Sequence, residues 1–181
     1  SQVNTIVREM LRENQRGGII RLLLGFLDDT RMPTAAVEII SGRTDEKFLD
    51  SMFRTIYERP GNNLVAALRQ FKKFAWADPD CPTLMQLDGI AHAGAVRVIM
   101  TSALDESVKL DMVGWLLLHA SKEGRQEAAT ALSRFEPGTR VYDLIHRGIR
   151  DQDVGVRSHL IPLLRPMKVP NAYSLLVHMV N

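Results

Sequence analysis

Disulfide-stabilised and membrane-spanning architectures are excluded first, because the sequence lacks the residues for them. The 181 residues include a single cysteine, Cys81, so neither an internal disulfide nor a multi-cysteine metal site can form. The richest apolar stretch, 19–27, is interrupted by Arg21 and Gly25, and it falls well short of the roughly 18 residues of a transmembrane helix. No signal peptide is recognisable. We therefore expect a cytoplasmic protein, and we expect that residues 1–181 do not insert into a membrane.

A strong excess of charge of one sign is also missing. The chain has 23 Lys and Arg against 21 Asp and Glu, a formal net charge of +2. Residues 121–181 hold 9 basic and 6 acidic side chains, which leaves +3 there and −1 in the rest of the chain. This bias is local and weak, so it does not indicate a polybasic nucleic-acid-binding tail.

Sequence signatures of catalysis are lacking as well. There is no Gly-x-Ser-x-Gly elbow, phosphate-binding loop or dinucleotide fingerprint, and the five histidines form no His-x-x-x-His pair. Asp88 and His92 are one helical turn apart, but two ligands make no metal site and a surface hydrogen bond is the simpler expectation. Cys81 lies among Asp78, Asp80 and two prolines; we expect it to be exposed, and carboxylates disfavour a reactive thiolate. We predict no catalytic, cofactor-binding or metal-binding residue, and thus a non-enzyme.

What the sequence does contain is helical periodicity along almost its whole length. Aromatic residues are sparse at 6%, and aliphatic residues dominate the apolar share of 45%. Apolar residues recur at helical spacing in stripes over 49–56, 64–75, 112–117, 128–135, 141–149 and 156–164. Pro162 falls inside the last stripe and should kink that helix. Asp105, Ser121 and Asp151 are candidate N-caps, and no alternating strand pattern competes.

Consecutive helices group into pairs with a period of about thirty residues. The expected pairs span 17–42, 46–76, 83–104, 107–135 and 139–166, with single helices over 3–14 and 170–180 at the two ends. A period of this length is typical of stacked units that cannot bury their apolar faces alone. Because the chain begins at Ser1, we treat 1–181 as one domain that is either complete or a piece of a longer protein.

The two last pairs resemble HEAT repeats. Asp153-Val-Gly-Val-Arg157, followed by Leu160 and Leu164, is similar to the second-helix signature of that family, and the helix over 141–149 resembles its first helix. The segment from Gly124 to Leu132 is a looser match. The resemblance implies an all-α, right-handed α-α superhelix (an armadillo-like solenoid) of about five HEAT-like helix pairs, with a flanking helix at each end.

The resemblance also implies a concave surface lined by the second helices. The basic residues expected there are Arg69, Lys72, Lys73, Arg97, Arg125, Arg134, Arg157 and Arg165. A row of guanidinium groups suits an acidic segment of another protein, so we predict a non-catalytic scaffold or adaptor for protein binding. Arg125 and Arg157 have a second interpretation, because arginines at this point of HEAT-like repeats often tie neighbouring repeats together through an acidic partner.

Two alternative functions follow from the same resemblance. HEAT-like DNA glycosylases hold nucleic acid in a basic groove with aromatic and acidic residues, and Trp76, Trp115 and Asp111 are the only residues here that imitate that set. The low net charge and the apolar neighbours of Trp115 speak against that reading. An enzyme-accessory role like that of HEAT-like phycobilin lyases is neither supported nor excluded by the sequence.

Overall fold

The computed structural model describes residues 9–11, 14–59 and 61–164, and this part of the chain confirms the predicted all-α class. Its α-helices are α2 (Gly17–Gly25), α3 (Thr34–Gly42), α4 (Glu46–Glu58), α5 (Asn62–Leu68), α6 (Gly89–Thr101), α7 (Glu106–His119), α8 (Lys122–Ala131), α9 (Thr139–Gly148) and α10 (Val154–Leu160). Short 3-10 helices are η1 (Phe26–Asp28), η2 (Pro82–Gln86), η3 (Leu132–Arg134) and η4 (Ile161–Leu164). Over these same ranges there is no strand, and every helix is too short or too polar to cross a bilayer.

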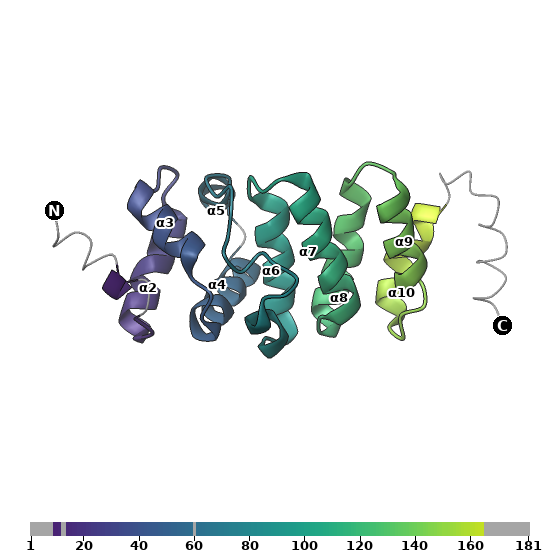
Figure 1. Cartoon of the computed structure of the whole chain (residues 1–181), viewed down its shortest axis with the longest axis horizontal. Helices are drawn as coiled ribbons and strands as arrows, with labels where there is room; N and C mark the ends of the chain where they lie inside the picture. The colour runs from purple at the N-terminus through teal and green to yellow at the C-terminus, as the bar shows by residue number, and fades with distance from the viewer. Residues whose placement is uncertain (1–8, 12–13, 60, 165–181) are drawn as a thin grey trace.

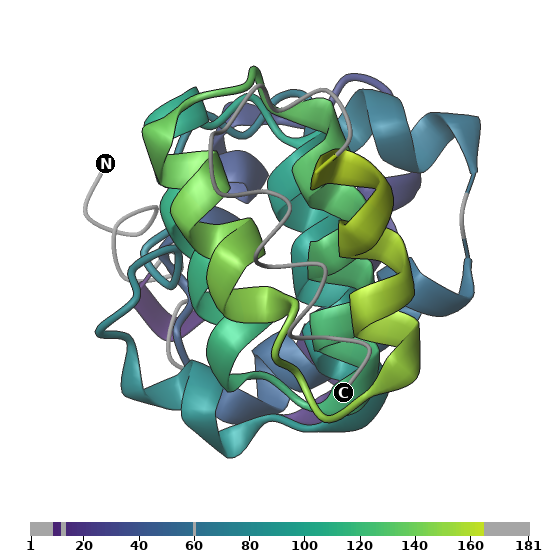
Figure 2. The same cartoon turned by 90° about the vertical axis from the view of Figure 1, so that its right-hand side faces the viewer.

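The helices stand side by side along the long axis of the molecule, in their order along the chain (Figure 1). One row is formed by α4, α6, α8 and α10, each of which packs against the next. Beside it, α7 packs against α6, α8 and α9, and α9 packs against α10. Viewed along the long axis, α9 and α10 lie next to one another in front of the earlier helices (Figure 2). The described core therefore runs between two layers of helices.

The expected pairs over 107–135 and 139–166 are present as α7–α8 and α9–α10. Their stripes face inward, since Leu116, Ala128 and Leu160 are fully buried. The expected kink at Pro162 takes the form of a change from α-helix to 3-10 helix at Ile161, because proline removes an α-helical hydrogen bond. The predicted flanking helices over 3–14 and 170–180 lie outside the described residues, apart from 9–11 and 14.

The helix predicted over 64–75 is wrong in its second half. α5 ends at Leu68, and turns together with η2 connect it to α6. Aromatic packing explains the difference: the rings of Phe71 and Phe74 stack at 4.8 Å, and Trp76 meets Phe53 edge to face at 4.8 Å. This burial outweighs the local helical preference. The pair expected over 83–104 consequently contains one α-helix, α6, preceded by η2 alone.

A further consequence is that α4, rather than α5, occupies the row with α6, α8 and α10. Figure 1 shows α5 above α4, away from the line of the row helices. The basic residues Arg69, Lys72 and Lys73, which follow α5, are therefore not on the row helices. The predicted assignment of these three to a second helix is wrong.

Each step of the row is tied by a polar contact to the residue directly before the next helix. Arg54 on α4 donates to Asp88, before α6, at 2.8 Å. The Ser121 N–H, before α8, donates to Nδ1 of the buried His92 on α6 at 3.0 Å. Gln126 on α8 donates to Asp153, before α10, at 2.8 Å. The three contacts differ in chemistry, being an ion pair, a backbone donor to an imidazole and an amide–carboxylate hydrogen bond, but each joins one row helix to the start of the next.

Two expectations from the sequence are wrong. His92 was expected to make a hydrogen bond at the surface, and Asp151 was expected to cap a helix. His92 is buried rather than at the surface, and its Nε2 lies 2.8 Å from the Leu84 carbonyl oxygen. The buried ring of His92 thus joins α6 to Ser121 and to η2. The N-cap of α10 is Asp153, whose carboxylate accepts a hydrogen bond from the Val156 N–H at 3.1 Å. The carboxylate of Asp151 forms an ion pair with Arg125 instead.

We expect the contribution of Asp153 to stability to be lost in acid. The Gln126 amide is the largest cause that lowers the pKa of Asp153 to about 2, and the Val156 N–H and Lys122 also lower this pKa against an opposing effect of burial. A carboxylate with a depressed folded-state pKa stabilises the fold above its unfolded pKa, about 4, and this effect disappears as pH falls through about 2. The melting temperature of wild type should therefore exceed that of Asp153→Asn at about pH 6, and the gap should narrow between about pH 4 and pH 2.

The asparagine variant keeps a capping side chain, so the comparison isolates the charge. Gln126→Ala removes the main cause of the lowered pKa of Asp153. In this variant, the stabilisation by Asp153 should be lost over a narrower range of acid pH. A gap between wild type and Asp153→Asn that stays constant from about pH 6 to pH 2 would contradict the proposed network.

Candidate functional site

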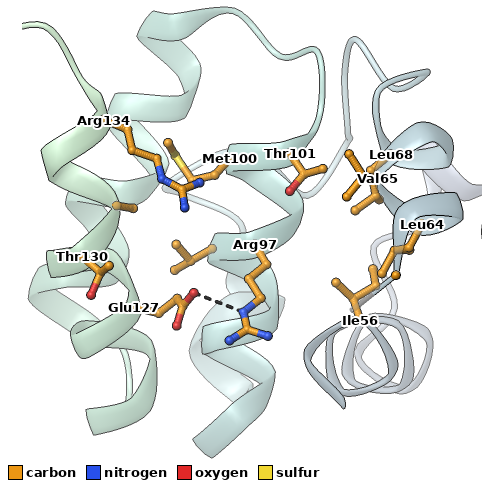
Figure 3. Close-up of a pocket in the computed structure, with 13 residues that line it drawn as sticks. Ile56, Leu64, Val65, Leu68, Arg97, Met100, Thr101, Glu127, Thr130 and Arg134 are labelled. Carbon is orange, nitrogen blue, oxygen red and sulfur yellow. Dashed lines mark hydrogen bonds and ion pairs between the residues drawn. The ribbon is translucent and has the colours of Figure 1, made fainter. Parts of the chain in front are cut away.

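One hollow that combines apolar and charged residues is a groove between α5, α6 and α8 (Figure 3). Its volume is about 340 Å³. α5 forms one wall and α8 with η3 the other, while α6 lies between them. The apolar part is lined mainly by Ile56, Leu64, Val65, Leu68, Val96 and Met100. On α5, Leu68 is buried, whereas Leu64 is partly exposed and Val65 is exposed on the wall of the groove.

Arg97, one of the predicted surface residues, lies on the α6 side of the groove and is held in place. Its Nε donates to Glu127 Oε1 at 3.1 Å, and an Nη donates to the Tyr57 carbonyl oxygen at 3.1 Å. The guanidinium also lies over the Tyr57 ring, 4.2 Å from its centroid. These contacts fix the planar group. The charge of Arg97 is thus already balanced by Glu127.

Arg134, the second predicted residue in the groove, differs from Arg97. It is exposed on η3, its side chain extends over the groove near Met100 (Figure 3), and within the described ranges it has no ion pair. The structure therefore brings two predicted residues, Arg97 and Arg134, into one groove, in which Glu127 pairs with Arg97. Two guanidinium groups and one carboxylate leave an excess positive charge at this end of the groove.

Arg125 and Arg157 meet instead at the loop between α9 and α10. Arg125 makes two contacts with the Asp151 carboxylate, Nε–Oδ2 at 2.7 Å and Nη–Oδ1 at 3.3 Å, and it also donates to the Ala120 carbonyl. Arg157 donates to the Asp151 carbonyl oxygen at 2.6 Å. Arg125 links α8 to the loop of the following pair, which is the structural role that the resemblance offered as the second interpretation.

The other predicted basic residues lie elsewhere. Arg69, Lys72 and Lys73 are exposed in the segment after α5, and Lys73 lines a separate hollow with Glu38 and Phe74. Arg165 lies outside the described residues. The described positions of the predicted set form three groups, in the groove, around Asp151 and after α5, and the groove is the one that adds an apolar surface.

The residues that imitate a glycosylase site do not converge. Trp76 is 0% exposed, inside the aromatic cluster. Asp111 pairs with Arg140, and both line a different groove between α7 and α9 together with Trp115. Trp115 is half-buried and contacts His119, so it is less buried than the core position expected for it. The fully buried ring of Trp76 cannot stack on a base.

Cys81 is buried, which makes the expectation of an exposed thiol wrong. It precedes η2, and its N–H donates to the Asp78 carbonyl in a tight turn. Among the described residues, no three His, Cys, Asp or Glu side chains gather as a metal site.

Sequence reasoning missed Glu127 and Tyr57, the residues that orient Arg97. Glu127 is 30 positions from Arg97 and Tyr57 is 40 positions away. The thirty-residue spacing was the available signal for Glu127, because it separates Arg97 on α6 from Glu127 on the adjacent helix α8. No comparable signal pointed to the Tyr57 carbonyl.

Comparison with known proteins adds no relative to this picture, since neither a protein family, nor a curated protein, nor a solved structure matches the chain.

Proposed function

We propose that the chain is a HEAT-like helical-repeat module that binds another protein through the groove between α5, α6 and α8. The proposal of stacked repeats is supported by the row of α4, α6, α8 and α10 and by a polar contact at each of its three junctions. In this reading the row helices are the second helices of a short α-solenoid. The pairs α7–α8 and α9–α10 are regular, and the region from α5 to η2 is an irregular unit.

The observation that carries the binding proposal is the composition of the groove. An apolar wall faces the same hollow as Arg134, which has no ion pair in the described part of the chain, and Val65 remains 37% exposed on that wall. Arginine is enriched at protein–protein interfaces, whose centres are apolar. A surface that is merely solvated does not require an exposed apolar wall and an arginine without an ion pair in the same groove.

Site-specific photo-crosslinking in the cells that produce the protein tests this function. A photoreactive amino acid replaces Val65 or Thr130, both in the groove, and Val154 serves as the matched control because it is exposed outside the groove. We expect discrete protein adducts from Val65 and Thr130 that Val154 does not give. Identical adducts from all three positions, or none from the groove, would refute the proposal, and nuclease-sensitive adducts would indicate nucleic acid instead.

A further inference from the structure

The chemistry of the groove specifies its partner more narrowly than a protein surface in general. Its charged residues lie at one end and its apolar residues extend toward α5 (Figure 3). Leu64, Val65 and Met100 are at least partly exposed and offer contacts for an apolar side chain of a ligand, and Arg134 offers donors at the opposite wall. A ligand that satisfies both must carry an apolar group and an anion a few ångströms apart.

The anion that fits is a carboxylate rather than a nucleic-acid phosphate. Among the described lining residues Arg134 is the cation without an ion pair, because Arg97 is paired with Glu127, and one unpaired cation suits a single anion better than a dense run of phosphates. Single-stranded nucleic acids are usually held by aromatic stacking platforms, whereas the lining includes no aromatic side chain among the described residues. Arg134 can bind a single carboxylate through two parallel N–H donors.

Extended or helical peptides present this combination directly. On a helix, an acidic residue three or four positions from an aliphatic residue shares its face, and amphipathic helices commonly dock in apolar grooves. A volume of about 340 Å³ accommodates a few side chains of such a segment, not the face of a folded domain. The groove is open to solvent along α5 and α8, which suits a continuous peptide chain.

We infer that the groove recognises an acidic amphipathic peptide segment of its partner, with an aliphatic or phenyl side chain against Leu64, Val65 and Met100 and a carboxylate on Arg134. This inference rests on the proposed protein-binding function. Arg97 acts in it as a positioning residue: its pairing with Glu127 and Tyr57 holds Glu127 away from Arg134 and leaves that guanidinium for the ligand.

Selection from a random peptide display library on the full chain provides the probe. We expect enriched peptides to share an acidic residue within four positions of Leu, Ile, Met or Phe. Fluorescence anisotropy of one enriched peptide should show about tenfold weaker binding to Arg134→Gln than to wild type, as expected for loss of one charge-assisted contact. Affinity should also fall as salt is raised.

Arg150→Gln is the matched control, because Arg150 is exposed outside the groove and its side chain has no ion pair in the described part of the chain. Its affinity for the peptide should equal that of wild type. Enrichment of peptides without acidic residues, equal binding by Arg134→Gln, or no enrichment would overturn the acidic-peptide inference. In that case, groove-specific crosslinks would still support the protein-binding function. The absence of such crosslinks would instead refute the protein-binding function itself.

Discussion

Replacement of Gly94 by alanine is expected to lower the free energy of unfolding by about 3 kcal/mol or more, through overpacking between two helices. A Cβ at this position of α6 would lie 2.0 Å from the Phe53 carbonyl oxygen and 2.5 Å from its carbonyl carbon, both backbone atoms of α4. A backbone cannot rotate aside as a side chain can. The two helices must therefore separate, which breaks the packing of the α4–α6 step, and the melting temperature should drop by roughly 6–12 °C.

Gly25→Ala is the control for this prediction. Gly25 ends α2 with helical dihedral angles, φ −59° and ψ −29°, and nothing lies within 4 Å of the position that a Cβ would take there. Alanine is the better helix former by up to about 1 kcal/mol, so this variant should be neutral or slightly stabilised. Chemical denaturation measures both variants. A Gly94→Ala protein as stable as wild type would show that α4 and α6 do not approach this closely.

Gly94 also shows what the sequence could not reveal about the fold. In a single sequence, a glycine inside a stripe weakens the helix prediction, and Gly89 with Gly94 obscures the boundary of the helix over 89–101. In the structure Gly94 is inside α6, where the close approach of α4 requires it. Gly124 has the same role at the next step, since a Cβ there would lie 2.4 Å from the His92 Cβ. Both glycines are explained by residues of the neighbouring row helix, Phe53 on α4 and His92 on α6.

Prediction succeeded where local pattern and tertiary packing agree. The helices α7 to α10 follow their apolar stripes because the buried side chains are those at helical spacing. It failed after Leu68, because Phe71, Phe74 and Trp76 pack with one another and with Phe53 instead of continuing the α5 stripe. Backbone contacts reinforce this conformation: the Ala75 N–H donates to the Ser41 carbonyl at 2.7 Å. Periodicity carries no information about such distant partners.

The candidate site was predictable to a similar degree. The resemblance to HEAT repeats implied that Arg97 and Arg134 share one surface, and the structure brings both into the groove. The sequence could not show that Arg97 is paired and Arg134 is not, because this difference depends on contacts of Glu127 and Tyr57 with Arg97. The same holds for Arg125 and Arg157, which resemble surface arginines in the sequence but bond to the loop that holds Asp151.

Arg43 gives the second large expected effect, because it is a charged residue buried to 1% exposure near the start of α4. It contacts both oxygens of Asp45, at 2.5 and 2.9 Å, and donates to the Leu11 and Asn14 carbonyl oxygens. Removal of one partner from a buried ion pair costs about 3–5 kcal/mol, since the other charge stays without compensation. We expect Arg43→Met, which keeps much of the side-chain volume, to lose stability in this range when unfolded in urea.

The cause of that loss can be separated by a double-mutant cycle. Asp45→Ala alone removes the ion pair and the cap on the Phe48 N–H, and Arg43→Met/Asp45→Ala removes both charges together. If the uncompensated carboxylate dominates the cost, the double variant should be more stable than the sum of the single effects predicts, with a coupling of about 1–3 kcal/mol. Strict additivity would instead assign the loss to the two carbonyl oxygens and to packing. Arg43→Lys then distinguishes charge from geometry, because an ammonium group keeps the charge but cannot contact both carboxylate oxygens and two carbonyls from one planar group.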